Sequence, residues 1–290
     1  MWLKNYKSGF PHILLFTSIF GISVGQHGDS SVAFWDNNEF DVLIFTQRWP
    51  ITGCIEWMEK ASDNVCILPS QKDVWGIHGI WPTRIGTMGP FFCNKSATFD
   101  IDTLKPIMEQ LDRNWLNIEK GKSDYSFWRH EWLKHGTCAS VLADLSTENK
   151  YFGQGLTWFQ QYAMDVFLAK ENIVPGSQYN ITDFQSAIKK TLNINPSIHC
   201  IKEKRSGNPY LAEIRICFNR NLELVNCDGI KFYTEENLIT NCQDDKPVWY
   251  PNAVPEYFLN RKPEHVERPV RRFPWVNLYK LIQILKWFTL

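Results

Sequence analysis

The sequence predicts a single disulfide-bonded domain of the α+β class, in which an antiparallel β-sheet packs with helices. Three observations support this class. Segments with strand patterns and segments with helical spacing both occur, but they follow no strict β-α alternation. Hydrophobic residues make up 44% of the 290-residue chain, which is enough for a sizeable core. The eight cysteines form an even number, which fits four disulfides.

Two strands are predicted in the first third of the chain. Residues 40–49, with the sequence FDVLIFTQRW, are rich in β-branched and aromatic side chains. Residues 74–80 form the second predicted strand, and Pro82 follows it closely.

Helices are predicted in the middle of the chain. Pro106 fits the first turn of the first helix, Gly136 is expected to close the second, and Thr182 is a suitable N-cap for the last. The four segments with apolar residues at helical spacing are 102–118, 126–135, 156–170 and 182–192.

A β-hairpin is predicted after these helices. Residues 211–218 alternate, with apolar side chains on one face and Glu213 and Arg215 on the other. A turn then leads into a second strand. This hairpin places Cys217 and Cys227 on facing strands, so we expect them to pair.

The first 25 residues have the pattern of a secretory signal peptide. Lys4 and Lys7 supply a positive start, residues 13–22 form a short apolar run, and residues 23–25 (SVG) are small enough for cleavage before Gln26. The apolar run is too short to span a bilayer.

Secretion would place the cysteines in an oxidising compartment, where they should pair. Asn94 and Asn180 begin N-x-S/T sequons and are predicted glycosylation sites. The predicted location is therefore extracellular or lysosomal.

We expect the catalytic domain to cover residues 26–260 and a basic linker with an apolar tail to cover residues 261–290. The tail is interrupted by Lys280 and Lys286 and is shorter than the roughly 20 apolar residues that a membrane span needs. The pattern of the tail fits two structures equally: an amphipathic helix on a membrane surface, or a helix docked on the domain.

Lys plus Arg and Asp plus Glu both number 31, so the chain is formally neutral. This balance excludes a polycation that grips nucleic acid by bulk charge. It leaves open a nucleic-acid enzyme with a local positive site.

Segment 127–138, FWRHEWLKHGTC, concentrates ionisable groups on one short predicted helix. Glu131 and His135 are four residues apart and share a face, and His130 and Lys134 form a second such pair. Two imidazoles, a carboxylate and an ammonium group can therefore converge on one cavity. That combination suits proton transfer at an anion.

Two other interpretations account for this helix less well. A zinc site of the H-E-x-x-H type needs two His four residues apart, whereas His130 and His135 are five apart and Lys134 opposes a cation. No metal and no cofactor are therefore expected. A solvated, salt-bridged helix explains Glu131 and Lys134 but not two Trp and two His in the same stretch.

Segment 75–82, WGIHGIWP, places His78 at a strand end, and Trp81 offers a flat face on which a base could stack. Two separated His are what cleavage of a phosphodiester by an internal 2′-hydroxyl requires. One takes the hydroxyl proton and the other protonates the leaving 5′-oxygen.

These two segments resemble the active-site motifs of the ribonuclease T2 family of acid ribonucleases. The resemblance extends from residues 45–50 (FTQRWP) to the last cysteine. It implies an α+β fold with an antiparallel sheet, and metal-independent cleavage of single-stranded RNA that leaves 2′,3′-cyclic phosphate ends. The implied disulfides are Cys54–Cys66, Cys93–Cys138, Cys200–Cys242 and Cys217–Cys227.

By motif position, the resemblance makes His78 the general acid and His135 the general base. Glu131 and Lys134 would polarise the phosphate and stabilise the pentacovalent state. The implied substrate-binding residues are His130 for phosphate, Trp81 for the first base, and Gln47.

The sequence also departs from the family pattern. Many relatives carry an Asp after H-G-I-W-P where this chain has Thr83, so base preference cannot be transferred. Residues 83–92 look longer than in some relatives, and the tail has no counterpart in most of them.

The leading prediction is a monomeric secreted or lysosomal endoribonuclease without a stable protein partner. The alternatives are a metal-dependent phosphoesterase and an RNA-binding or toxin-like module that acts without catalysis.

Overall fold

The computed structural model describes residues 39–71, 73–87, 89–230 and 240–260. The predicted signal segment 1–25 and the predicted linker and tail 261–290 lie outside the described residues. The proposed domain limits therefore stay predictions.

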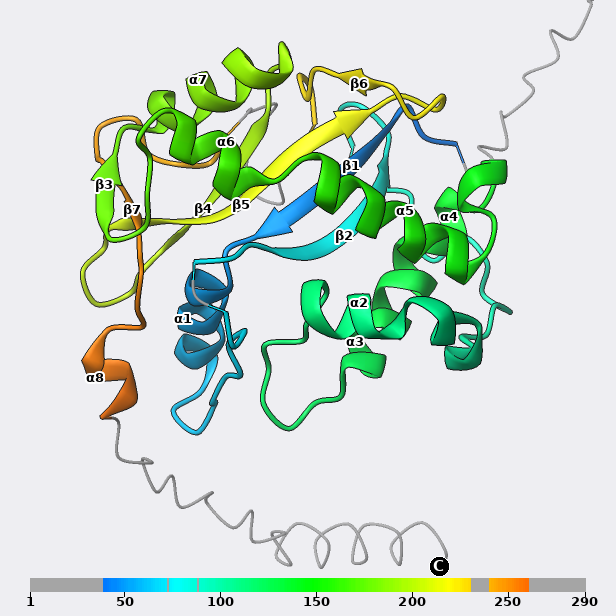
Figure 1. The fold of residues 1–290 in the computed structure, drawn as a ribbon, viewed down its shortest axis with the longest axis horizontal. Coiled ribbons are helices and arrows are strands. Elements are labelled where there is room, and N and C mark those ends of the chain that lie inside the picture. The colour runs from blue at the N-terminus through cyan, green and yellow to red at the C-terminus, as the bar shows by residue number, and fades with distance from the viewer. Residues whose placement is uncertain (1–38, 72, 88, 231–239, 261–290) are drawn as a thin grey trace, which may run out of the picture. The chain divides into compact units, whose positions relative to one another are not determined.

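A seven-stranded sheet forms the centre of the described structure (Figure 1). Its order is β2-β1-β5-β7-β3, and β4 and β6 also pair with β5. All pairings are antiparallel except that of β5 with β7, so the sheet is mixed rather than purely antiparallel. The strands are β1 Val42–Arg48, β2 Gly76–Thr83, β3 Ser177–Tyr179, β4 Ser197–Lys202, β5 Pro209–Phe218, β6 Leu224–Val225 and β7 Val248–Tyr250.

Both faces of the central strands are covered. On β1, Leu43 and Phe45 enter the main core, while Val42 and Ile44 belong to a second cluster on the opposite face. This double burial explains why the segment reads as a near-continuous apolar run.

Helices pack on and around this sheet. In Figure 1, α5, α6 and α7 lie across one of its faces. On that side the ring of Trp158 stacks on Phe218 with centroids 3.8 Å apart. The larger helices are α1 Pro50–Lys60, α2 Met108–Asn114, α3 Asp124–Glu131, α5 Glu148–Gln161, α6 Met164–Lys170 and α7 Ile181–Leu192. The remaining helical segments are η1 Ile101–Ile107, η2 Trp132–Gly136, α4 Thr137–Ala139, η3 Ala143–Leu145 and α8 Glu256–Leu259.

Three helix predictions differ from the structure. The segment predicted as one helix over 102–118 is a 3₁₀-helix containing Pro106, followed by the short α2. The segment 156–170 is divided at Tyr162, whose carbonyl oxygen accepts a hydrogen bond from Gln47 Nε2. The N-cap of α7 is Asn180, which forms a capping box with Asp183, rather than Thr182.

All eight cysteines pair within the described residues. The pairs are Cys54–Cys66, Cys93–Cys138, Cys200–Cys242 and Cys217–Cys227, as the resemblance implied. None of the described helices combines the length and the apolar character that crossing a membrane requires.

Candidate active site

Three elements bring the predicted catalytic residues together. His78 and Trp81 lie on β2, Glu131 ends α3, and Lys134 and His135 lie in η2. The ladder between β1 and β2 shifts register where His78 lies, because Thr46 pairs with Gly79 but Gln47 pairs with Ile77. His78 therefore occupies a β-bulge, a feature that redirects side chains beside functional sites.

The indole of Trp81 joins these groups. Its ring centroid lies 4.9 Å from that of His78 and 5.5 Å from that of His135. Its Nε1 donates a hydrogen bond of 3.0 Å to Oε2 of Glu131. Both imidazoles and the carboxylate thus contact one aromatic side chain.

Gly79 permits this close assembly. A Cβ on Gly79 would lie 2.2 Å from Glu131 Oε2 and 2.3 Å from Trp81 Nε1. Any larger residue would therefore collide with both partners of the hydrogen bond.

The predicted end of the catalytic helix at Gly136 is wrong. Residues Trp132–Gly136 form a π turn, in which the Thr137 N–H bonds to the carbonyl oxygen of Trp132. Helical structure then continues into α4. Position 136 within this helical stretch requires glycine, because a Cβ there would lie 2.2 Å from the Trp132 ring. The π turn is wider than an α-helical turn, and such turns are frequent at functional sites.

His135 is buried, with 4% of its surface exposed. Its Nδ1 has no hydrogen-bond partner among the described residues. Burial, together with the positive charges of Lys134 and His130, holds the pKa of His135 well below its ordinary value. This environment therefore favours the neutral imidazole.

His78 lies in a different environment, with 30% of its side chain exposed. Its Nδ1 lies 2.5 Å from Oε1 of Glu213 on β5. Burial opposes ionisation of this carboxyl group, but Arg215 and His78 outweigh it and hold the pKa of Glu213 well below its usual range. The partner of His78 is therefore a carboxylate.

Sequence reasoning missed Glu213 as a functional residue. The alternating pattern of residues 211–218 placed Glu213 and Arg215 on a polar face, yet Glu213 is 8% exposed. The signal that could have indicated its role is the presence of a carboxyl side chain within a strand of the predicted sheet.

Glu131 and His130 differ in exposure. Glu131 is buried, and burial raises its pKa, although His78 and the Trp81 hydrogen bond oppose this rise. His130 lies at the exposed rim. Partial desolvation and Lys134 lower its pKa. The site therefore extends from a buried carboxyl group at Glu131 to a solvent-exposed imidazole at His130.

The segment before Cys93 packs on η2. The Phe92 N–H donates to the Lys134 carbonyl oxygen at 2.9 Å, and Cys93 is bonded to Cys138. Phe91 lies with its ring centroid 5.6 Å from that of His135, and the ammonium of Lys134 is 5.1 Å from the Phe91 ring.

Gln47 does not join the site. It is fully buried, donates to the Tyr162 carbonyl oxygen at 2.6 Å, and pairs with Ile77 and Ile214, which belong to the main core. Since successive strand residues face opposite sides, the neighbouring Arg48 points to the Glu213 face instead. The Arg48 guanidinium lies 4.8 Å above the Phe127 ring.

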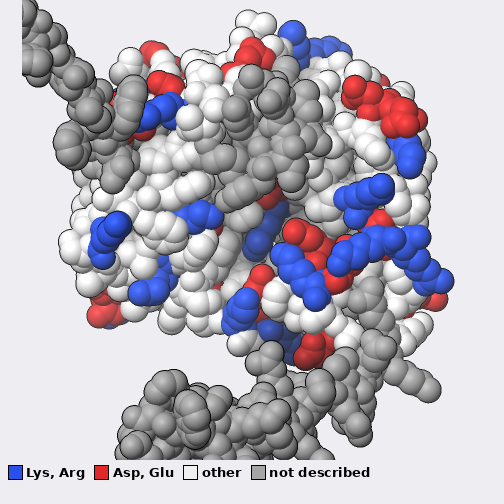
Figure 2. All heavy atoms as spheres, turned by 180° about the vertical axis from the view of Figure 1, so that it is seen from behind, with Lys and Arg blue, Asp and Glu red and all other residues white. Residues whose placement is uncertain are grey.

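Charges of both signs are mixed on the face opposite the view of Figure 1. Lys and Arg side chains lie beside Asp and Glu around a hollowed region (Figure 2). The surface seen there has no uniform basic field, in keeping with the neutral net charge.

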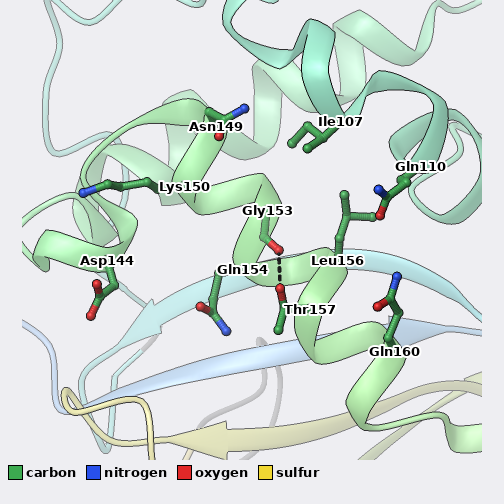
Figure 3. Close-up of a pocket in the computed structure, with 10 residues that line it drawn as sticks. All are labelled: Ile107, Gln110, Asp144, Asn149, Lys150, Gly153, Gln154, Leu156, Thr157 and Gln160. Carbon is green, nitrogen blue, oxygen red and sulfur yellow. Dashed lines mark hydrogen bonds between the residues drawn. The ribbon is translucent and has the colours of Figure 1, made fainter.

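A separate hollow lies along α5, where Asp144, Lys150, Thr157 and Gln160 surround Gly153 (Figure 3). None of the predicted catalytic residues lines it. Among the described residues, no three or more His, Cys, Asp or Glu are grouped so that they could hold a metal ion.

Two imidazoles of unequal environment, a lysine and a buried carboxyl group thus define an acid–base site suited to an anionic substrate.

The comparisons with known proteins agree with this description. The model of the Ribonuclease T2 family matches residues 40–227. The chain is 35% identical over 217 residues to Ribonuclease Oy of Magallana gigas, covering 73% of this chain and 97% of that protein. It is 33% identical over 219 residues to Ribonuclease T2 of Sus scrofa, covering 74% and 98%.

Solved structures show the same fold. The crystal structure of human RNase T2 matches with a TM-score of 0.59 and 28% identity, covering 73% of this chain and 99% of that one. RNase NT in complex with 5′-AMP matches with a TM-score of 0.60 and 23% identity, covering 73% and 98%. The chain belongs to the ribonuclease T2 family. It is an endoribonuclease of the type that forms 2′,3′-cyclic phosphate ends.

Proposed function

We propose that this endoribonuclease cleaves single-stranded RNA without a metal, with His135 as general base and His78 as general acid. The observation that carries this assignment is the contrast between the two imidazoles. His135 is buried, and its pKa is held well below the ordinary value chiefly by burial. His78 faces the carboxylate of Glu213 at 2.5 Å. A neutral imidazole accepts a proton, and one paired with a carboxylate is stabilised when protonated.

The proposed step balances as follows. His135 takes the proton of the 2′-hydroxyl, and the 2′-oxygen forms a bond to phosphorus. The bond from phosphorus to the 5′-oxygen breaks, and His78 gives its proton to that leaving oxygen. The products are a 2′,3′-cyclic phosphate and a 5′-hydroxyl, and both imidazoles have exchanged their protonation states.

The remaining residues act on the phosphate and the base. Lys134 lies on η2 with His135, and His130 lies at the end of α3 that precedes it. Both would stabilise negative charge on the phosphoryl oxygens. Glu131, buried beside them, would polarise the phosphate. The Trp81 indole would stack on the base next to the scissile phosphate.

The cellular setting is also a proposal. Residues 1–25 would direct the chain into the secretory route, to the exterior or the lysosome, where the four disulfides persist. Asn94 and Asn180 are both exposed, as glycan acceptors must be.

The test incubates the purified protein with single-stranded RNA at pH 5 in EDTA and identifies product ends by mass spectrometry. We expect cyclic phosphate ends, and loss of cleavage in His135→Ala and His78→Ala. Cleavage that requires a divalent metal would overturn the metal-free mechanism. Cleavage that survives His135→Ala would overturn the assignment of the base.

A further inference from the structure

We propose that Glu213 is a positioning residue for His78, which it fixes in one ring orientation and holds ready as a proton donor. This inference rests on the proposed role of His78 and adds a residue that the two active-site motifs do not contain.

The position of Glu213 makes it a rigid support. It lies on β5, which pairs with β1, β4, β6 and β7 and is the most connected strand of the described sheet. Within the ladder Glu213 is opposite Arg48 on β1 and His199 on β4. A side chain anchored there is held by backbone pairing on both sides of its strand.

The two oxygens of Glu213 have separate partners. Oε2 accepts hydrogen bonds from Nε of Arg215, at 3.0 Å, and from its Nη2, at 2.5 Å. Oε1 is left to His78 Nδ1, also at 2.5 Å. Arg215 alone would satisfy the charge of a structural carboxylate. The division of the oxygens instead directs one of them at the catalytic imidazole.

This contact determines which ring nitrogen meets the substrate. Facing a carboxylate, Nδ1 must carry a hydrogen, so the remaining nitrogen, Nε2, is the one free to exchange a proton with the leaving oxygen. The same contact keeps the ring from rotating and stabilises the imidazolium.

Arg215 extends this support toward the base. Its guanidinium carbon lies 5.2 Å above the Trp81 ring, and Trp81 in turn contacts His78. The side chains that hold the proposed acid and the proposed stacking surface are therefore packed on one another.

Charged and titratable groups from several elements surround His78 and contribute, with Glu213, to the electrostatic potential at its ring. They are Glu213 and Arg215 on β5, His199 on β4, Arg48 on β1, Glu131 and His130 on α3, and Lys134 and His135 on η2. Among these, Glu213 is the group hydrogen-bonded to the imidazole.

The first test is the pH–rate profile of Glu213→Gln, which keeps the size and a hydrogen-bonding oxygen but removes the charge. We expect its alkaline limb to move to lower pH, because a neutral amide stabilises a protonated donor less than a carboxylate does. The control is Glu203→Gln. Glu203 is a buried carboxylate that lies just beyond β4 and accepts from the Arg205 and Ser206 N–H groups, away from the site. Its profile should overlay that of the wild type.

The second test does not need RNA. The ¹⁵N NMR signals of the His78 ring are followed against pH in the wild-type protein and in Glu213→Gln. We expect hydrogen on Nδ1 in the neutral wild-type ring, and a titration curve displaced to lower pH in the variant. Since this measurement is independent of cleavage, it still decides the role of Glu213 if the proposed function fails.

Superimposable profiles and superimposable His78 titration curves in wild type and Glu213→Gln would overturn the proposal and leave Glu213 a structural ion-pair partner. If Glu213→Gln does not fold, the same titration is made on Glu213→Asp, which withdraws the carboxylate by one methylene. For Glu213→Asp, a His78 titration curve that overlays that of the wild type, together with an unchanged kcat, would also overturn the proposed role of Glu213.

Discussion

Trp81 Nε1 and Glu131 Oε2 are joined by a hydrogen bond that connects β2 to the end of α3. The bond fixes the buried carboxyl group from the side of the sheet. The same indole contacts His78 in a T-shaped arrangement and His135 in a tilted one. The two sequence motifs, some fifty residues apart, are therefore coupled by a single contact as well as by proximity.

Trp81→Phe tests this contact, because it keeps an aromatic face but removes the N–H. We expect kcat to fall roughly 10-fold, about 1.4 kcal/mol, with a smaller change in KM. Steady-state kinetics on a dinucleotide substrate would measure both. A raised KM with unchanged kcat would show that the indole only binds the base.

Gly79→Ala places a methyl group on top of the same hydrogen bond. We expect a loss of about 1–3 kcal/mol in unfolding free energy and a large fall in activity. Gly153→Ala on α5 is the matched control, because a Cβ there meets no atom within 4 Å and should stabilise the helix by about 0.5–1 kcal/mol. Chemical denaturation of both variants checks the pair. Equal stability of the two would refute the steric argument.

The acid limb of the pH–rate profile should extend well below pH 6.5. Burial lowers the pKa of His135, so this base stays neutral until the pH falls to that lowered value. We expect cleavage at pH 5 to exceed cleavage at pH 8, because a formally neutral chain gains positive charge as the pH falls and then attracts RNA more strongly. An optimum above pH 8 would contradict this prediction.

Stability should decline on the acid side of pH 6.5, and His199 should account for part of that decline. Burial lowers the pKa of His199 to about 4, whereas in the unfolded chain it is near 6.5. The unfolded state therefore binds the proton first, and stability falls as the pH drops from 6.5 toward 4. Glu213, with a depressed pKa, loses its contribution only below about pH 4.5.

The measurement compares thermal unfolding of wild type and His199→Gln at pH 7 and pH 5. His199 should cost the wild type about 2 kcal/mol at pH 5 relative to pH 7, and the variant should be spared that loss. If stability declined equally in both proteins, protonation of His199 would not contribute to the loss of stability in acid.

Local patterns were sufficient for the elements that local chemistry determines. The alternation in residues 211–218 and the following turn predicted the β5–β6 hairpin and the Cys217–Cys227 pair. The apolar run at 40–49 predicted β1. Helix α1 was not predicted, although Pro50 at its first turn was an available signal.

Features that depend on tertiary contact could not be predicted in the same way. Gly136 is a strong stop signal in a sequence, but here the Trp132 ring occupies the space of its absent side chain. Gln47 lies next to Arg48 in the chain, yet the pleat of β1 sends it into the opposite core. The partnership of His78 with Glu213 spans 135 residues and depends on strand pairing across the sheet.

The π turn has a consequence for how this segment tolerates change in length. Substituting Leu133 leaves the number of residues between Glu131 and His135 unaltered. A π turn holds one residue more than an α-helical turn, so deleting one residue there would convert it to α-helix and leave Cys138 in register with Cys93. The residues inside the turn would be displaced instead, and His135 would lose its position against the Trp81 ring. Two chains can therefore share the same catalytic residue types and still differ in active-site geometry, if one has a residue more or less between Glu131 and His135.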